Sequence, residues 1–319
     1  MQRNKGRILA IVGPTASGKT SLSIELAKAL DGEIVSCDSM QVYRGMDVGT
    51  AKPTEEERDG VLHHLIDVAD AHTPFSAAEY VTLARKAAEE ILARGRLPVF
   101  CGGTGLYLDS LLRGGFEETQ SDPAIRERLE AFFEENGAHA LHERLREVDP
   151  ESAAAIHENN VKRVIRALEI YESTGMTKTE ADRRTFEMER PFDATVIGLF
   201  YPTREILYGR IERRVDAMLQ GGLAQEARRL DDDGVFLSNT TAAQAIGYKE
   251  ILPYVRGEES LEASRERLIR ATRHYAKRQL TWFGAKDYVR RVDMEKDGIV
   301  RSSEDVLCEV LRIVSEDIR

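Results

Sequence analysis

The sequence predicts an α/β fold built on a mostly parallel β-sheet, together with an all-helical insertion. Short apolar segments that end at glycine or polar residues alternate with helical segments, which is typical of parallel sheets joined by right-handed crossovers. The segment "GPTASGKT" at 13–20 directly follows the first apolar segment and precedes a helical one. From about 116 to 191 the strand pattern stops and helical periodicity continues alone.

The composition is that of a globular protein. The chain has 319 residues, of which 42% are hydrophobic and 31% charged, so a disordered chain is excluded. The apolar run near the start is too short for a signal-peptide core or a membrane span, and we expect a cytoplasmic protein. Cys37, Cys101 and Cys308 lie far apart without C-x-x-C spacing, which supports neither a disulfide framework nor a zinc site.

The net charge of −10 argues by itself against a nucleic-acid partner, but the charge is unevenly distributed. Lys and Arg far outnumber Asp and Glu between Ala263 and Arg291. A local basic stripe on an acidic protein can still bind RNA.

The elements follow from these patterns in chain order. We expect strands at 7–13, 32–37, 97–100, 194–201 and 288–292, and the first helix at 19–30. Asp122 followed by Pro123 marks a helix start, with the aspartate as cap and the proline in the first turn. A core formed by 1–115 and 192–319 is therefore predicted, with a helical domain at 116–191. His63 and His64 are adjacent, so we expect a structural role and not a helix-spaced metal site.

The first loop carries the clearest chemical signal. It matches G-x-x-x-x-G-K-[ST], in which backbone N–H groups surround phosphates, a lysine adds charge, and a hydroxyl holds Mg²⁺. The flanking strand and helix are those of a P-loop NTPase-like core. We predict phosphate binding by the loop and Mg²⁺ binding by the Thr20 hydroxyl, the loop residues being Gly13, Pro14, Thr15, Ala16, Ser17, Gly18, Lys19 and Thr20.

Polar residues also follow the next two strands, at the sheet edge where such folds bind ligands. Asp38 to Gln41 follow the second strand, and Gly102 to Gly105 follow the third. Asp38 can act as a general base, as a partner of bound Mg²⁺, or as a solvated carboxylate. Thr104 is placed to touch a phosphate or an acceptor. In "REILYGRIERRVDAML", Arg210 and Arg214 border an apolar stripe, so they need an anion, either a diphosphate or an acidic side chain.

Two helical segments carry basic faces. In "NNVKRVIRALEIY", Lys162, Arg163 and Arg166 lie opposite Val161, Ile165 and Leu168. In "SRERLIRATRHYAKRQLTWF", Arg270, Arg273 and Lys277 run beside an apolar stripe and are interleaved with Tyr275, Trp282 and Phe283. Cations between aromatics suit phosphate contacts and base stacking. Alternatively, the cations form a solvated helix face and the aromatic side chains belong to the hydrophobic core.

Taken together, the sequence resembles the tRNA dimethylallyltransferase family, also called tRNA isopentenyltransferases. The resemblance runs in order through "GPTASGKT", "DSMQVYRGMDVGTAKP", "HHLIDV", "FSAAEY", "GGTGLY", "KRVIRALEI", "QAIGYKE" and "YAKRQLTWF". It implies transfer of a dimethylallyl group from dimethylallyl diphosphate to N6 of adenosine 37, in tRNAs that read codons beginning with U. The loop at 13–20 then holds a prenyl diphosphate and not ATP.

The resemblance also implies site residues and partners. The catalytic set is Asp38 as base, with Thr104, Lys19, Arg210 and Arg214 around the leaving diphosphate and Mg²⁺ as cofactor. The helical domain would bind the anticodon stem-loop. The protein would act as a monomer and would not associate with a membrane. The implied tRNA-binding residues are Asp38, Ser39, Met40, Gln41, Thr104, Arg126, Lys162, Arg163, Val164, Ile165, Arg166, Gln244, Ala245, Ile246, Gly247, Tyr248, Lys249, Lys277, Arg278, Gln279, Leu280, Thr281, Trp282, Phe283 and Gly284. Gly284 stands where the family more often has arginine, which puts one RNA contact in doubt.

Three alternative functions remain open at this stage. A relative that prenylates free adenine nucleotides would not need the helical insertion or the basic stripes. A P-loop kinase for a small hydroxyl substrate would consume ATP. An RNA-binding switch with a nucleotide sensor would bind tRNA and turn over nothing.

Overall fold

The computed structural model describes residues 6–113, 122–187 and 189–318. Two compact units make up the chain, one formed by Met1–Asp109 with Phe192–Arg319 and the other by Ser110–Pro191. The predicted first domain boundary, at 115/116, lies outside the described residues. Within them, no helix is both long and apolar enough to cross a bilayer.

A six-stranded sheet forms the centre of the first unit, with the strand order β3-β2-β4-β1-β5-β6. All five of its strand pairings are parallel. A short antiparallel pair, β7 with β8, follows β6. The bounds are β1 Gly6–Val12, β2 Gly32–Ser36, β3 His63–His64, β4 Leu97–Gly102, β5 Phe192–Phe200, β6 Val289–Asp293, β7 Glu295–Lys296 and β8 Ile299–Val300.

The α/β prediction is confirmed, and each of the five predicted strands is present within one or two residues at either end. The edge strand β3 was missed because its two residues are too few to show a strand pattern. The register places β1 between β4 and β5, with Val12 opposite Gly102 and Gly198. The loops after β1, β2 and β4 therefore leave the same edge of the sheet.

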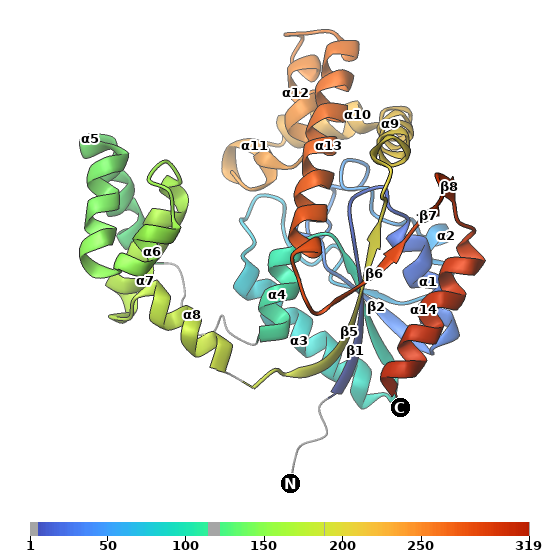
Figure 1. Cartoon of the computed structure of the whole chain (residues 1–319). Coiled ribbons are helices and arrows are strands. Elements are labelled where there is room, and N and C mark those ends of the chain that lie inside the picture. The colour runs from blue at the N-terminus through green and yellow to red at the C-terminus, as the bar shows by residue number, and fades with distance from the viewer. Residues whose placement is uncertain (1–5, 114–121, 188, 319) are drawn as a thin grey trace. The chain divides into compact units, whose positions relative to one another are not determined.

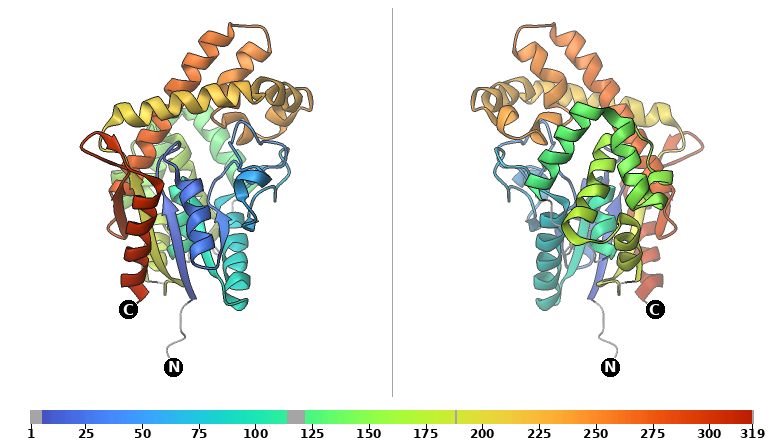
Figure 2. Two further views of the ribbon diagram at one scale, coloured as in Figure 1. Left: turned by 90° about the vertical axis from the view of Figure 1, so that its right-hand side faces the viewer. Right: turned by 90° about the vertical axis from the view of Figure 1, so that its left-hand side faces the viewer.

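Helices cover both faces of this sheet (Figures 1 and 2). On one face, α1 (Lys19–Ala29) and α14 (Ser303–Ile318) pack against the strands through Leu22, Val306 and Val310. On the other face lies α3 (Ala77–Ala93), which begins with a capping box formed by Ser76 and Glu79.

A second group of helices stands beyond the carboxyl ends of the strands (Figure 1). Leu207, Ile211 and Val215 of α9 are nearly inaccessible to solvent and pack in one core with α10, α12 and α13, as the helical periodicity predicted. The bounds in this group are α9 Arg204–Gln220, α10 Leu223–Asp232, α11 Val235–Ser238, η1 Ala242–Gln244, α12 Tyr248–Val255 and α13 Leu261–Gly284. Two further helices of the chain are α2 Glu55–Arg58 and α4 Gly105–Arg113.

The unit Ser110–Pro191 is helical, with α5 Pro123–Val148, α6 Pro150–Ala155, α7 Val161–Thr174 and α8 Lys178–Glu187. Asp122 caps α5 by accepting from the Ala124 N–H at 2.9 Å, as its sequence predicted. Asn160 is the N-cap of α7, but its side chain makes no capping hydrogen bond. Leu129, Leu141 and Val164 meet in a core within this unit.

One buried carboxylate makes fold stability depend on pH. Glu33 is 1% exposed at the start of β2. Burial opposes its ionisation, yet hydrogen bonds from Arg94, His64 and Arg96 lower its pKa from 4.5 to about 2. A depressed pKa stabilises the fold above pH 4.5, and this contribution is lost as the pH falls toward 2.

We therefore expect Glu33→Gln to lower the urea midpoint of unfolding at pH 7, and the difference from the wild type to shrink between pH 4.5 and 2. Urea titrations of both proteins across this range measure it. A difference that stays constant across the range would contradict the assignment.

Candidate functional site

The loop after β1 has the backbone of an anion-binding turn. Gly13 has φ 150°, and a Cβ there would lie 2.9 Å from the carbonyl oxygen of Leu199. Ala16 and Gly18 have φ 62° and 92°. Gly18 is the N-cap of α1 and no side chain caps this helix, so the N–H groups of its first turn point to an open helix end. Such an end attracts phosphate.

Side chains from distant elements hold this loop. The Gln279 Oε1 atom accepts from the Thr15 N–H at 2.8 Å, and its Nε2 donates to the Gly103 carbonyl at 3.0 Å. Arg210 Nε donates to the Ala16 carbonyl at 2.6 Å. The Ser17 N–H donates to the Pro14 carbonyl at 3.3 Å. The amides of Thr15 and Ser17 are therefore engaged within the protein, and phosphate binding by the loop stays a prediction.

Asp38 lies two residues after the end of β2, in a turn held by hydrogen bonds. Its Oδ1 accepts from the Met40 N–H at 2.9 Å and more weakly from the Gln41 N–H at 3.4 Å. The Ser39 N–H donates to the Thr104 hydroxyl at 3.1 Å. The Thr104 hydroxyl is thus bonded to the Asp38 turn, and its contact with substrate stays a prediction.

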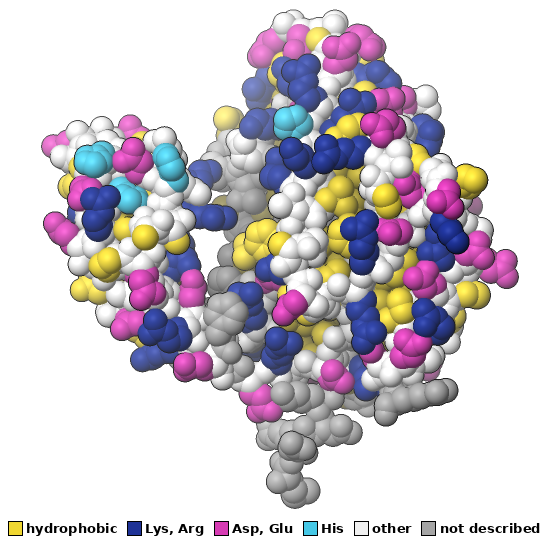
Figure 3. Space-filling view, viewed as in Figure 1, with side chains coloured by type: hydrophobic (Ala, Val, Ile, Leu, Met, Phe, Trp, Pro, Cys, Tyr) yellow, Lys and Arg dark blue, Asp and Glu magenta, His cyan; other side chains and the backbone are white. Residues whose placement is uncertain are grey.

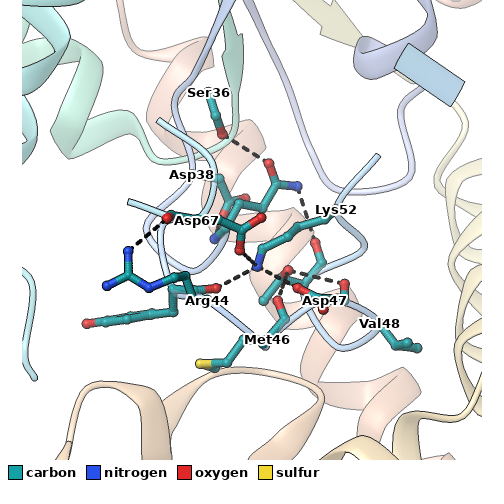
Figure 4. Close-up of polar contacts among 12 residues, drawn as sticks. Ser36, Asp38, Arg44, Met46, Asp47, Val48, Lys52 and Asp67 are labelled. Atoms are coloured by element: carbon teal, nitrogen blue, oxygen red, sulfur yellow. Dashed lines mark hydrogen bonds and ion pairs between the residues drawn. The ribbon is translucent and has the colours of Figure 1, made fainter. Parts of the chain in front are cut away.

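The segment after Asp38 is held by a polar network (Figure 4). The Lys52 ammonium, with a side chain only 5% exposed, donates to Asp47 at 2.6 Å and to Asp67 and the Tyr43 carbonyl at 2.5 Å each. Gln41 accepts from the Ser36 hydroxyl at 3.0 Å. All three ammonium hydrogens have partners, so Lys52 is a structural cation and not a ligand group.

Lys19 and Arg214 are the cations next to the loop. Burial is the largest effect on both and lowers their pKa values, while the carboxylate of Asp38 raises them. Among the described residues, no acidic side chain forms an ion pair with Arg210 or Arg214. The sequence allowed either a diphosphate or an acidic side chain as the partner of these arginines. In the described residues, neither arginine has the acidic side chain.

These groups line a cavity of about 300 Å³. Thr15, Lys19 and Thr20 lie on its wall together with Asp38 and Arg214. A second cavity of about 890 Å³ lies over the phosphate loop and α9 and shares Lys19, Thr20 and Arg214 with the first. The same cations therefore face two openings, with Asp38 on the side of the smaller cavity.

The predicted magnesium site has suitable donors. Mg²⁺ prefers oxygen ligands and usually keeps several waters while binding one or two protein groups and substrate phosphates. The Thr20 hydroxyl and the Asp38 carboxylate line the same cavity. This oxygen set fits Mg²⁺ carried by a diphosphate.

The RNA-contacting residues implied by the resemblance lie in different surroundings in the structure. Eight of them besides Asp38 line the smaller cavity, namely Ser39, Met40, Gln41, Gln244, Ala245, Ile246, Arg278 and Gln279. Others are buried elsewhere: Tyr248 is 0% and Phe283 1% exposed. Trp282 packs against Gly105, where a Cβ would lie 2.3 Å from its ring. For Phe283 the structure therefore favours the alternative of a core aromatic over base stacking, because solvent does not reach its side chain.

The basic face of α7 is smaller than predicted. Lys162 and Arg163 are exposed, whereas Val164 and Ile165 are buried in the core of the helical unit. Arg166 pairs with the buried Glu169 at 2.9 Å. Arg126 lies 3.6 Å from Glu130 on α5. The side chains of Lys162 and Arg163 are thus open to solvent, and Val164 and Ile165 pack in the core and hold the helix in place.

Along α13, Lys and Arg side chains gather on the surface (Figure 3). Arg270, Lys277 and Arg278 are exposed. Arg273 pairs with Glu212 and lies 4.8 Å above the Tyr208 ring. Lys277, Leu280, Thr281 and Gly284 line a separate hollow. Lys249 is bonded to Gln244 at 2.7 Å, and Gly247 has φ 111° before α12.

Comparison with known proteins decides the family. Residues 41–286 match the model described as IPP transferase. The chain belongs to the IPP transferase family. A tRNA dimethylallyltransferase of Halalkalibacterium halodurans is 50% identical over 91% of this chain and 92% of its own length. One from Bacillus subtilis is 48% identical over 92% and 93%.

Solved structures of this family share the fold. The full-length tRNA isopentenylpyrophosphate transferase of Bacillus halodurans matches with a TM-score of 0.71 and 46% identity, over 98% of this chain and 97% of that one. A eukaryotic dimethylallyltransferase acting on tRNA matches with a TM-score of 0.83 and 30% identity, over 98% and 80%. The resemblance read from the motifs is confirmed.

The cation arrangement predicts how the site binds anions. We expect Lys19→Ala and Arg214→Ala each to weaken binding of inorganic diphosphate by ~10- to 100-fold, because hydrogen bonds to charged groups contribute about 1.5–3 kcal/mol. Isothermal titration calorimetry measures it, with Arg312→Ala, an exposed position on α14, as control. Unchanged affinity in both site variants would contradict the anion site.

Proposed function

We propose that this protein transfers a dimethylallyl group from dimethylallyl diphosphate to N6 of adenosine 37, in tRNAs that read codons beginning with U. The products are N6-(dimethylallyl)adenosine and diphosphate. One observation carries the proposal: Asp38 shares a cavity with the phosphate loop and with Arg214, which forms no ion pair with any acidic side chain in the described part of the chain. The names of the relatives supply the substrate class.

The donor side of the reaction rests on the loop and the arginines. The amides at the start of α1, Lys19 and Arg214 bind the diphosphate, and Arg210 holds the loop through the Ala16 carbonyl. As the bond between the allylic carbon and oxygen breaks, both electrons leave with the diphosphate. Preorganised donors at the developing charge are the largest electrostatic contribution available here. Mg²⁺ bound at Thr20 would neutralise further charge on the leaving group.

The acceptor side rests on Asp38. The exocyclic amine of adenine is a poor nucleophile, because its lone pair is delocalised into the ring. As the C–N bond forms, N6 becomes positive, and a carboxylate in reach accepts its proton. Two backbone N–H groups fix the orientation of Asp38 through Oδ1. Nitrogen therefore gains the prenyl carbon and loses one proton.

Adenosine 37 is stacked beside the anticodon and must leave the stack to enter the cavity, which costs a few kcal/mol. Phosphate contacts can offset this cost. We propose that exposed cations supply them: Lys162 and Arg163 on α7, and Arg270 and Lys277 on α13. We further propose a monomer acting in the cytoplasm, because one chain lines both cavities and translation uses the modified tRNA there.

One incubation tests the function directly. The protein is mixed with labelled dimethylallyl diphosphate, Mg²⁺ and unmodified tRNA, and label in RNA is followed with time. Parallel reactions replace tRNA with AMP, or the prenyl donor with ATP. Label confined to AMP, or ATP consumption without a prenylated product, would assign the chain to another activity.

Asp38→Asn keeps the size of the side chain and removes the base. We expect kcat to fall by ~10²-fold or more, because general base catalysis contributes about that much. The Kd for tRNA should change little. Single-turnover prenylation and filter binding measure the two values, with Asp297→Asn in the β7–β8 turn as control. Near-normal turnover would rule out Asp38 as the base.

The exposed cations of α13 make a separate prediction. In Arg270→Ala/Lys277→Ala, tRNA should bind more weakly, and the slope of log K against log salt should become shallower by about one for each cation that contacts a phosphate. Binding at several salt concentrations gives the slope. Lys86→Ala, exposed on α3, serves as control. An unchanged slope would place the RNA elsewhere.

A further inference from the structure

A buried carboxylate on α10 holds the backbone of the segment that follows Asp38. Glu226 is 9% exposed, and its Oε2 accepts from the N–H groups of Asp47 and Val48 at 3.0 Å each. Its Oε1 accepts from the Gly49 N–H at 3.0 Å and from the Tyr248 hydroxyl at 2.6 Å. Both oxygens are thus used by three consecutive amides and one phenol, which compensates the desolvation of the charge.

The residues around Glu226 allow the close approach of the segment to α12. A Cβ at Gly49 would lie 2.4 Å from the Tyr248 ring, so only glycine allows the chain this close to α12. Tyr248 is 0% exposed and the first residue of α12. Burial and the Glu226 carboxylate both raise its pKa, which keeps the phenol protonated as a donor. The contacts of Glu226 with Tyr248 and with the amides of Asp47, Val48 and Gly49, here called the clamp, therefore join α10, α12 and the segment Asp47–Gly49.

From this clamp a short series of contacts leads to Asp38. Gly49, Thr50 and Ala51 line the cavity that holds Asp38. The carbonyls of Thr50 and Ala51 accept from Gln41 Nε2 at 3.3 Å each. The Gln41 N–H in turn approaches Asp38 Oδ1 at 3.4 Å. Displacement of the segment would therefore shift the cavity wall and the Gln41 side chain beside Asp38.

We propose that Glu226 is a positioning residue, which fixes the part of the Asp38 cavity wall formed by Gly49 to Ala51 by binding the amides of Asp47, Val48 and Gly49. The effect on catalysis rests on the proposed function; the hold on the segment does not. Glu226 touches neither substrate, since it lines neither cavity. It acts through the segment that it binds.

Glu226→Gln tests this with little change of shape. Its amide NH₂ turns one acceptor into a donor facing backbone N–H groups, so the clamp opens. We expect two results. Hydrogen exchange of the amides of residues 47–49 accelerates by ~10-fold or more, because hydrogen bonds to a charged group are lost. The kcat for tRNA prenylation falls by ~10²-fold, as a displacement of about 1 Å at a reacting site can cause. The Kd for tRNA in the absence of donor should stay within ~3-fold, because the phosphate contacts lie elsewhere.

Glu33→Gln is the matched control. Glu33 is likewise a buried, hydrogen-bonded carboxylate, but it lies at the start of β2 and lines neither cavity. The Glu33→Gln variant should be less stable than the wild type, while its kcat and the hydrogen exchange of the amides at 47–49 stay as in the wild type. A kcat loss in Glu226→Gln no larger than in Glu33→Gln, or unchanged exchange at 47–49, would overturn the proposal.

A second variant covers the case in which Glu226→Gln does not fold. Tyr248→Phe removes one of the four bonds and keeps the ring, so we expect kcat to fall by ~3- to 10-fold, with faster exchange at Gly49. Wild-type behaviour in both readouts would then refute the clamp. If the wild type itself does not prenylate tRNA, the proposed function fails, and the exchange data still decide whether Glu226 holds the segment.

Discussion

Two half-buried cations, Lys19 at the start of α1 and Arg214 on α9, line the same cavity, and burial lowers the pKa of each. Desolvated positive charge is unfavourable unless an anion is near, and Asp38 is the carboxylate whose charge favours their ionised forms. In the proposed function, a diphosphate would add the missing negative charge beside the loop amides. Asp38, the proposed base, lies in the smaller cavity, and the larger cavity shares Lys19 and Arg214 with it.

Holding such charges in place requires fully satisfied polar contacts behind them. Gln279 joins the phosphate loop to the turn after β4, and Lys52 fixes the segment after β2 through two carboxylates and a carbonyl. Glu226 binds the backbone N–H groups of the segment Asp47–Gly49. Each of these groups is buried or nearly so, where a lost partner costs more than in water. The geometry of the site thus depends on side chains that hold the surrounding backbone in place.

The helices beyond the sheet edge serve two purposes at once. Helix α13 supplies Gln279 to the interior and exposed cations to the surface, and α9 supplies an apolar face together with Arg210 and Arg214. An amphipathic helix permits this because successive residues point in different directions. The same periodicity gives the helical unit its core and leaves Lys162 and Arg163 exposed.

The sequence by itself determined the α/β class, the five main strands, the helix start at Asp122 and the phosphate loop, because these depend on local periodicity, capping and a short motif. Its ordered motifs also indicated the family, which the comparisons confirm. Only the tertiary structure decided which loop amides are free, that Thr104 and Gln279 join loops, that Tyr248, Val164 and Phe283 are buried, and that Glu226 binds the 47–49 backbone. These contacts join residues up to 264 positions apart, and local propensity carries no information about such pairings.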